Sequence, residues 1–392
     1  MVFLTLIIGL ALIPTLTLFV EVLAAIVPRH EPASDGGVAP GTVAVVIPAH
    51  NESAGIIPTL RDIVPQLREH DRLIVVADNC NDDTAAVAAA QGAQVLVRSE
   101  PDKRGKGYAM AWAVGHMADN PPDFVLFVDA DCRLQSDFVT GALNHSSQHA
   151  RPVQALYLMT GPEPPRDNQR VAEFAWRLKN WVRPLGLTFL RRPVQLMGTG
   201  MMFPWSVIKS APLASGNIVE DLKLGLDLAI SGSPAYFLPS VRVTSEFAAT
   251  ESGAETQRQR WVQGHLAMIA SYVPRLLAAA LVNGNVDLLA LALDLLVPPL
   301  SLLVMIAGGA LLVAAAFALL TGELLPAALA FLNLVLLAVS IVLAWSRFGR
   351  DVLPGRQILS AIGQVPQRLR LLRRLARGGA SEWVRTDRQK PE

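Results

Sequence analysis

The chain has 392 residues, of which 52% are hydrophobic and only 17% are charged, and its formal net charge is +1. That length exceeds one ordinary core and predicts two or three structural units. The mean hydropathy of +0.37 is too apolar for a water-soluble protein of this size. This composition excludes a disordered chain, the charge argues against a nucleic-acid binder, and the two cysteines are too few for a disulfide framework.

The first segment of the chain is apolar enough to cross a bilayer. Val2 to Val27 is interrupted only by Pro14 and Glu21, and about 20 residues span the hydrocarbon layer. A cleaved signal peptide is the alternative, but the sequence shows no basic amino-terminal region and no small-residue cleavage site. We therefore expect residues 1–28 to form a transmembrane helix. In it, Glu21 either serves a function or snorkels or hydrogen-bonds to a neighbouring helix.

Residues 29–41 are rich in Pro and Gly and are expected to form a linker, after which short apolar runs alternate with helical stretches. Strands are expected over Val43–Ile47, Arg72–Ala77, Val95–Val97 and Phe124–Val128, with helices over Ile56–Glu69, Thr84–Gln91 and Gly107–Met117. This alternation predicts an α/β domain over residues 42–263, with a mostly parallel, doubly wound sheet covered by helices on both faces. Ligands of such sheets bind beyond the carboxyl ends of the strands.

Polar residues follow the carboxyl ends of the expected strands. The first strand runs into Pro48-Ala49-His50-Asn51-Glu52, the second into Asp78, and the fourth into Asp129-Ala130-Asp131. Carboxylates at three strand ends would repel an anionic substrate unless a divalent cation lay between them, and such oxygen ligands suit Mg²⁺ or Mn²⁺. Taken alone, the Asp-x-Asp pair has a second interpretation, as turn carboxylates that cap the next helix.

Three further motifs carry groups suited to a diphosphate or a sugar. The segment from Lys103 to Gly107 combines cations with glycines that let backbone N–H groups approach a phosphate, although a solvated basic turn has the same composition. Asp221 opens a helical stretch, so its carboxylate either favours the helix N-terminus or faces a cleft as a base. The residues Gln257, Arg260 and Trp261 fall on one helical face, which suits binding to a diphosphate and stacking on a sugar.

As a set, these motifs resemble the family 2 glycosyltransferases, especially the membrane-anchored branch that includes cellulose synthase, hyaluronan synthase and ceramide glucosyltransferase. The resemblance covers about residues 43–265 and depends on the order and spacing of short pieces. The pieces are Pro48 to Glu52, Asp78, Asp129 with Asp131, Gly198-Thr199-Gly200, Glu220-Asp221 and Gln257-x-x-Arg260-Trp261. The resemblance implies a GT-A fold, which is Rossmann-like, and a nucleotide-sugar donor.

The resemblance also implies roles for individual residues. Asp221 would deprotonate the acceptor hydroxyl, and Asp129 and Asp131 would hold Mg²⁺ or Mn²⁺ and the donor diphosphate. Further donor contacts would come from Pro48, His50, Asn51, Glu52, Asp78 and Lys106. Contacts to the acceptor and the diphosphate would come from Gly198, Thr199, Glu220, Gln257, Arg260 and Trp261. With one positioned base, and no second carboxylate implied near the anomeric carbon, the transfer is expected to invert that carbon.

The remaining segments predict how the domain is attached to a membrane. Residues 264–294 are expected to hold an interfacial amphipathic helix, and residues 295–346 two further spans. Arginines follow the first and last spans, but no Lys or Arg lies between the last two, which predicts a cytosolic domain on a multi-pass inner-membrane protein. The tail, residues 347–392, carries 11 basic and four acidic residues, and its segment 366–377 is expected to lie on anionic lipid.

Together these features predict a glycosyltransferase that moves a sugar from a UDP-linked donor to a lipid-linked or saccharide acceptor. Three spans are fewer than a polymer channel needs, so we expect the addition of one or a few sugars and no polymer channel within the chain itself. We expect this step to belong to exopolysaccharide assembly, in contact with membrane lipids and an export complex. A glycolipid transferase of the ceramide or hopanoid type is the first alternative. Outside this class, a membrane nucleotidyltransferase would release pyrophosphate, and an inactive export-complex scaffold would not need the intact acidic residues.

Overall fold

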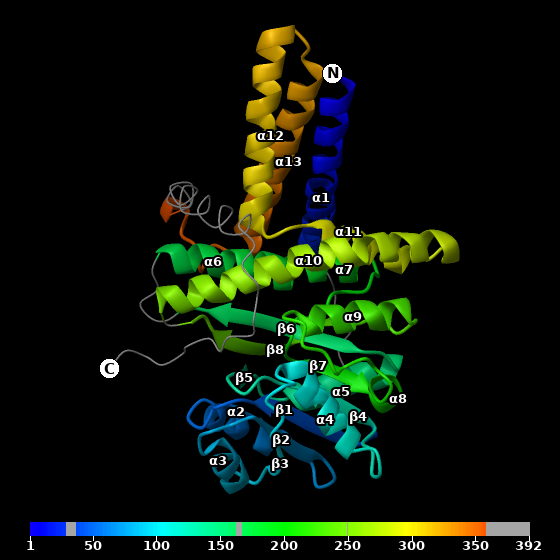
Figure 1. The fold of residues 1–392 in the computed structure, drawn as a ribbon, viewed down its shortest axis with the longest axis vertical. Coiled ribbons are helices and arrows are strands. Elements are labelled where there is room, and N and C mark those ends of the chain that lie inside the picture. Colours follow the sequence, from blue (N-terminus) through cyan, green and yellow to red (C-terminus); the bar gives the residue numbers. More distant parts are fainter. Residues whose placement is uncertain (29–36, 162–166, 249, 358–392) are drawn as a thin grey trace. The chain divides into compact units, whose positions relative to one another are not determined.

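The computed structural model describes residues 1–28, 37–161, 167–248 and 250–357, and Figure 1 traces its elements along the chain. Two compact units divide the chain. Among the described residues, the apolar-helix unit consists of residues 1–28, 161, 167–192 and 265–357, and the sheet unit consists of residues 37–160, 193–248 and 250–264. Residues 167–192, which lie inside the expected domain 42–263, thus group with the apolar helices.

The sheet unit is built on one mixed sheet. Within the described residues, eight strands line up in the order β3-β2-β1-β4-β7-β6-β8-β5. Their bounds are β1 Val43–Ala49, β2 Arg72–Asp78, β3 Gln94–Arg98, β4 Phe124–Phe127, β5 Arg133–Leu134, β6 Val153–Thr160, β7 Met201–Pro204 and β8 Tyr236–Glu246. Strands β3, β2, β1 and β4 are parallel, whereas β7 is antiparallel to β4 and β6. The predicted α/β class is confirmed, and the second half of the sheet adds antiparallel pairs.

Helices connect these strands (Figure 1). Their bounds are α2 Ile56–Ile63, α3 Thr84–Ala90, α4 Lys106–His116, α5 Phe138–His149, α8 Trp205–Ile208 and α9 Glu220–Ile230. The helix expected over Ile56–Glu69 ends early. After Ile63 the chain forms a short 3₁₀ turn, η1, over Val64–Gln66, because Pro65 has no amide hydrogen for the next α-helical bond.

The core of the sheet unit lies between the sheet and helices α4, α8 and α9. Residues Val43 to Ile47 of β1 are all 0% exposed. Their apolar run is continuous because both faces of this central strand are covered. Phe127 of β4 meets Phe203 of β7 edge to face, with ring centroids 5.8 Å apart. This aromatic pair joins the parallel half of the sheet to the antiparallel half.

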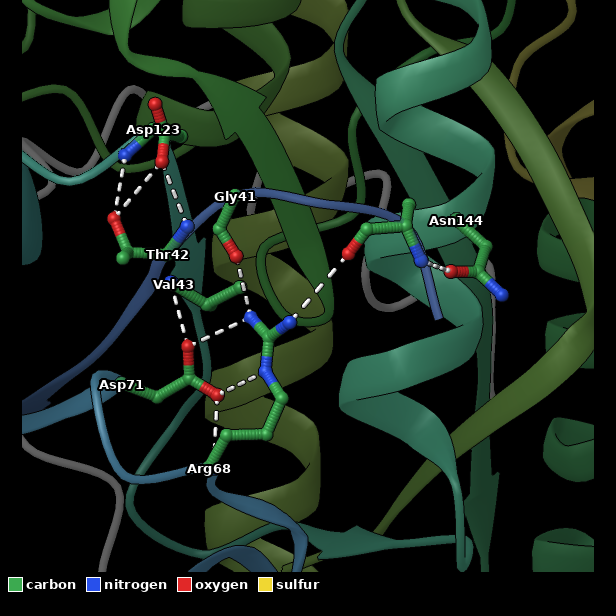
Figure 2. A network of polar contacts seen from close by, with 8 residues as sticks. Gly41, Thr42, Val43, Arg68, Asp71, Asp123 and Asn144 are labelled. Carbon is green, nitrogen blue, oxygen red and sulfur yellow. Dashed lines mark hydrogen bonds and ion pairs between the residues drawn. The ribbon is translucent and has the colours of Figure 1, made fainter. Parts of the chain in front are cut away.

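A polar network holds the start of β1 (Figure 2). Asp71 accepts hydrogen bonds from the amide of Val43 at 2.8 Å and from the guanidinium of Arg68 at 2.9 Å. The Asp123 carboxylate accepts a bond from the amide of Thr42 at 2.7 Å. Since Asp71 precedes β2 and Asp123 precedes β4, this network ties together the amino-terminal ends of three neighbouring strands.

The carboxyl ends of β1, β2 and β3 lie at the opposite edge of the sheet. Asp78, the last residue of β2, is in register with Arg98, the last residue of β3. Just beyond β1 and β2, Asn51 and Asn79 have φ angles of 55° and 52°, a conformation that asparagine tolerates better than most residues. The expected site residues of the early motifs therefore lie at the strand ends and on the turns of this edge.

The apolar-helix unit contains the remaining helices. Their bounds are α1 Val2–Ile26, α6 Asp167–Arg177, the π-helical turn η2 Leu178–Val182, α7 Arg183–Phe189, α11 Val286–Leu296, α12 Leu300–Thr321 and α13 Leu325–Phe348. Helix α10, Glu251–Asn283, begins in the sheet unit and ends in the apolar-helix unit. In the described part of the chain, four helices, α1, α10, α12 and α13, are long and apolar enough to cross a membrane. The motif at Gln257 and the segment expected at the interface thus share one continuous helix.

The range predicted for two further spans, residues 295–346, contains most of the helices α12 and α13, but its first residues belong to α11. Helix α12 starts directly after Pro298 and Pro299, and it ends at Gly322, whose φ of 78° suits a glycine cap. Helix α13, Leu325–Phe348, continues two residues past that range. The interfacial helix expected over residues 366–377 lies outside the described residues.

Three buried charges meet inside the apolar-helix unit. Arg183, the first residue of α7, forms ion pairs with Glu21 of α1 at 2.9 Å and with Asp294 of α11. These three residues are 5%, 2% and 4% exposed. Helix α7 can approach α1 because Gly186 has no side chain, since a Cβ there would lie 2.0 Å from the Glu21 carbonyl oxygen. Of the alternatives for Glu21, the structure therefore shows the bond to a neighbouring helix.

Candidate active site

Lys106 is the cation around which several expected site residues gather. It opens helix α4 directly after Gly105, whose φ of 130° favours glycine. Its ammonium group forms an ion pair with the Asp129 carboxylate and donates a hydrogen bond to the carbonyl oxygen of Gly198 at 2.5 Å. The basic glycine turn that contains Lys106, the Asp129 motif and the Gly198 motif are far apart in the sequence, and they therefore meet at the Lys106 side chain.

The Asp221 carboxylate lies beside the same glycine. A Cβ on Gly198 would be 3.2 Å from Oδ2 of Asp221 and 3.8 Å from Nζ of Lys106. Burial opposes the charge on Lys106, but the carboxylates of Asp129, Glu220 and Asp221 raise its pKa above the usual value. Burial, together with the charge of Asp221, raises the pKa of Glu220 to about 8.

The turn from Asp129 to Cys132 offers ligands for a cation. Carboxylate oxygens of Asp129 and Asp131 and the Sγ atom of Cys132 lie within 4.8 Å of one another. Burial, with the charge of Asp129, raises the pKa of the Cys132 thiol to about 12, and a thiol sulfur is a soft ligand. The remaining donors are two carboxylates, which are the hard ligands that Mg²⁺ and Mn²⁺ prefer. The donor set thus fits such a cation, with Asp129 and Asp131 as its ligands.

Buried hydroxyl groups contact the backbone of this turn. The Thr199 hydroxyl accepts a hydrogen bond from the amide of Asp129 at 3.0 Å. The Thr59 hydroxyl lies 2.8 Å from the carbonyl oxygen of Ala130 and 2.7 Å from that of Cys132. Both threonines are 0% exposed. Thr199, which was expected to contact the acceptor or the diphosphate, is thus placed behind the turn, and Thr59 was missed because nothing local marks it within helix α2.

A pocket of about 140 Å³ lies next to Lys106. It is lined by Pro48, Ala49, His50, Asp78, Asn79, Arg104, Gly105, Lys106 and Ala109. These residues come from the carboxyl ends of β1 and β2 and from the start of α4, which is where parallel sheets bind their ligands. Four of the expected donor contacts, at Pro48, His50, Asp78 and Lys106, therefore share one pocket with the basic glycine turn.

Asp78 is held by a cation that the sequence reasoning missed. Arg98 pairs with the Asp78 carboxylate at 2.5 Å, and the side-chain amide of Asn79 donates to the same oxygen at 3.0 Å. Nδ1 of His50 lies 2.7 Å from the backbone carbonyl oxygen of Asp78. Burial raises the pKa of Asp78, and the charge of Arg98 opposes this shift. The only signal of Arg98 in the sequence is its place at the end of an expected strand.

Asn51 and Glu52, also expected on the donor side, lie in the loop after β1 and form hydrogen bonds with residues after β2. The side-chain oxygen of Asn51 accepts a bond from the amide of Asn81 at 2.8 Å, and the amide of Glu52 donates to the Thr84 hydroxyl at 2.8 Å. Within the described residues, neither Asn51 nor Glu52 lines the pocket. Their bonds join the loop after β1 to the loop after β2, the two loops that flank the pocket.

The motif formed by Gln257, Arg260 and Trp261 lies on the first turns of α10. Gln257 is 4% exposed, and Arg260 lies close enough to Glu220 to interact with its charge. Farther along α10, a Cβ on Gly264 would come within 2.6 Å of the Val219 side chain, directly before α9. The start of α10 and the start of α9 are therefore neighbours in the sheet unit.

Parts of this chain are similar in sequence to known proteins. Low-salt glycan biosynthesis hexosyltransferase Agl6 of Haloferax volcanii is 33% identical over 114 residues, which are 29% of this chain and 26% of that protein. Glucosyl-3-phosphoglycerate synthase of Mycobacterium tuberculosis is 38% identical over 96 residues, which are 23% of this chain and 29% of that protein. The chain thus spans less than a third of the length of these curated relatives.

Two broader comparisons cover most of the chain. The mannosyltransferase PcManGT from Pyrobaculum calidifontis, solved in complex with GDP-Man and Mn²⁺, superposes with a TM-score of 0.50 at 17% identity, covering 88% of this chain and 99% of that one. This likeness shows the fold, which is of the GT-A type. The family model described as "Glycosyltransferase like family 2" matches residues 40–264. This match covers more than half of the chain and every expected site residue, so the chain belongs to the glycosyltransferase-like family 2.

Proposed function

We propose that the chain is a membrane-bound, inverting glycosyltransferase that uses a nucleotide sugar as donor. The observation that carries this proposal is the meeting of Asp129, Gly198 and Asp221 at Lys106, next to a pocket at the carboxyl ends of the strands. A cation there suits an anionic leaving group, and a carboxylate beside it suits a general base. Membership of the family supports the same class of reaction.

The donor nucleotide is assigned to the pocket. His50 and Asp78 line it at the ends of β1 and β2, and Arg104 and Lys106 bring positive charge to it from the basic glycine turn. Such cations, together with the backbone of Gly105 that lines the pocket, suit a diphosphate. A UDP-linked sugar is the expected donor. Since PcManGT was solved with GDP-Man, a guanosine donor is the competitor that a test must include.

Asp129 and Asp131 are assigned to Mg²⁺ or Mn²⁺ beside the donor diphosphate. When bound, such a cation would supply positive charge to the leaving group. Lys106, which pairs with Asp129, would add a second positive charge on the same side. The presence of Mn²⁺ in the PcManGT complex supports this choice of metal.

Asp221 is assigned as the base. Its carboxylate lies beside Gly198, and its charge helps to raise the pKa of the neighbouring Glu220. As the acceptor hydroxyl oxygen bonds to the anomeric carbon, its proton passes to Asp221. The bond from that carbon to the diphosphate breaks, and the nucleoside diphosphate leaves with the electron pair. A single displacement of this kind inverts the anomeric carbon.

The acceptor is assigned to the side of the site formed by the starts of α9 and α10. Arg260 and Glu220 interact there, and Gln257 and Trp261 belong to the same motif. Helix α10 is continuous from this motif to Asn283 and is one of the four long apolar helices. We therefore propose a lipid-linked or saccharide acceptor at the cytoplasmic face of the inner membrane, as in the branch that includes cellulose synthase, and a role beside an export complex in exopolysaccharide assembly.

Turnover of the purified full chain in lipid nanodiscs tests the proposal. UDP- and GDP-sugars are supplied with Mn²⁺ and a lipid-linked saccharide, the released nucleotide is identified, and the anomeric configuration of the product is read by NMR. We expect acceptor-dependent release of a nucleoside diphosphate and an inverted product. Release of pyrophosphate would instead indicate nucleotidyl transfer, and a retained configuration would remove the single-displacement mechanism.

A further inference from the structure

We infer that Thr59 and Thr199 are positioning residues that set the geometry of the Asp129–Asp131 pair before a cation binds. The inference rests on the proposed function, because it concerns the cation that those carboxylates would hold. Neither threonine reaches the surface, since both are 0% exposed. Their effect therefore has to pass through the backbone of the turn.

The two hydroxyl groups come from segments on either side of the turn in the sequence, Thr59 before it and Thr199 after it. Thr199, in the turn before β7, accepts the amide hydrogen of Asp129, and its oxygen also lies 3.4 Å from the Sγ atom of Cys132. Thr59, inside α2, lies within hydrogen-bond distance of two carbonyl oxygens, those of Ala130 and Cys132. Side-chain hydroxyls from elsewhere in the fold thus lie within hydrogen-bond distance of backbone groups at three of the four positions of the turn.

Gln154 on β6 forms a hydrogen bond with the backbone of Thr199. Its amide nitrogen donates to the carbonyl oxygens of Thr199 at 2.9 Å and Ala155 at 2.8 Å, and its amide oxygen accepts the amide hydrogen of Met197 at 2.7 Å. Gln154 is itself 0% exposed. A buried amide with its bonds satisfied in this way is rigid, so the position of the Thr199 hydroxyl is set by the sheet.

A rigid turn favours cation binding for a physical reason. Two carboxylates that already lie close together lose less conformational freedom when a cation joins them than two carboxylates on a loose loop. Groups that orient metal ligands typically change metal affinity or activity by about 10–100-fold when they are removed. Because these hydroxyls do not reach the reacting atoms, their loss should weaken cation binding more than it slows the transfer step.

Valine tests each hydroxyl because it keeps the shape of threonine and removes the oxygen. We expect Thr199→Val to raise the dissociation constant for Mn²⁺ by about 10-fold or more, with a matching rise in the Mn²⁺ concentration needed for half-maximal rate and a nearly unchanged kcat. Thr199→Ser keeps the hydroxyl and should restore most of the affinity. Ser146→Ala is the matched control, because Ser146 is a buried hydroxyl of the sheet unit whose bond goes to the Arg151 carbonyl oxygen at 2.9 Å.

Direct titration with Mn²⁺, followed by the EPR signal of the free ion, measures the affinity without turnover. Wild-type affinity in Thr199→Val, or a serine variant as weak as the valine variant, would overturn the inference. If Thr199→Val does not fold, Thr59→Val and Thr59→Ser test the same statement from the other side of the turn. A wild-type chain that binds no Mn²⁺ would instead remove the metal from the proposed function, and the inference with it.

Discussion

Each unit of this molecule contains a cation whose charged group lies among carboxylates away from bulk solvent. In the sheet unit, Lys106 pairs with Asp129 and interacts with Asp221, and its side chain is 19% exposed beside a pocket. In the apolar-helix unit, Arg183 pairs with Glu21 and Asp294, and its side chain is 7% exposed. The charges are alike, but the surroundings and the cations differ.

The comparison separates a site that can exchange partners from a contact that holds helices together. A lysine ammonium is a flexible point charge, and next to a pocket a diphosphate can take over from its carboxylate. The guanidinium of Arg183 is a rigid fork that bonds to two helices at once, and burial makes the loss of either partner expensive. Exposure and an adjacent pocket, more than charge itself, therefore distinguish the cluster proposed to be functional from the structural one.

The largest effect should come from removing the proposed base. We expect Asp221→Asn to lower kcat by about 10²–10⁴-fold, because an amide cannot accept the proton of the acceptor hydroxyl. Donor binding, measured by calorimetry, should stay close to that of the wild type. Asp227→Asn, in the same helix, is the control, since its carboxylate pairs with Lys223 at 2.6 Å. Substantial transfer by Asp221→Asn would take the role of base away from this residue.

Removing the cation of the structural cluster should act on stability. We expect Arg183→Met to lower the free energy of unfolding by about 3–5 kcal/mol, because it leaves Glu21 and Asp294 buried without their partner. Thermal unfolding in detergent measures the loss, and the rate per folded molecule should change little. Adding Glu21→Gln and Asp294→Asn should recover part of the stability. A stable Arg183→Met protein that has lost transfer would show that the two clusters do not differ as proposed.

Removing one ligand of the proposed cation should act on binding. We expect Asp131→Ala to weaken Mn²⁺-dependent donor binding by about 10–100-fold, because the remaining carboxylate cannot hold the cation alone. Calorimetric titration of the donor with and without Mn²⁺ isolates the metal-dependent part. Asp119→Ala, at an exposed position after α4, serves as the control. Equal donor affinity in wild type and Asp131→Ala would contradict the assignment.

The smallest effect concerns acid stability and involves neither cluster. Burial, with the neighbouring His149, lowers the pKa of His145 to about 4. An unfolded histidine titrates near 6.5, so between pH 6.5 and 4 the unfolded chain binds the additional proton and folding stability falls as the pH is lowered. We expect His145→Gln to weaken this dependence, so that the fall in Tm between pH 6.5 and pH 4 is roughly 2–4 °C smaller than in the wild type. An unchanged slope would assign the acid sensitivity to other groups.

Much of the sheet unit could be predicted because its information is local. The continuous apolar run of β1, the alternation of strands and helices, and the polar residues after each strand all lie within short windows of sequence. A parallel sheet then brings the strand ends to one edge, so the proximity of His50 and Asp78 followed from the fold class. The antiparallel strand β7 was not foreseen, since no local pattern reports the direction in which a distant strand returns.

The sequence alone determined the apolar helices α1, α12 and α13, the parallel half of the sheet and the residue types of the site, because periodicity, length and side-chain chemistry are properties of short segments. Only the tertiary structure decided that Thr59 and Thr199 hold the Asp129 turn, that Arg98 holds Asp78, and that Arg183 joins Glu21 to Asp294. Each of these contacts joins residues at least 20 positions apart. A pair of that kind exists only after the chain has folded, when burial removes water and leaves each polar group with the partner that the packing provides.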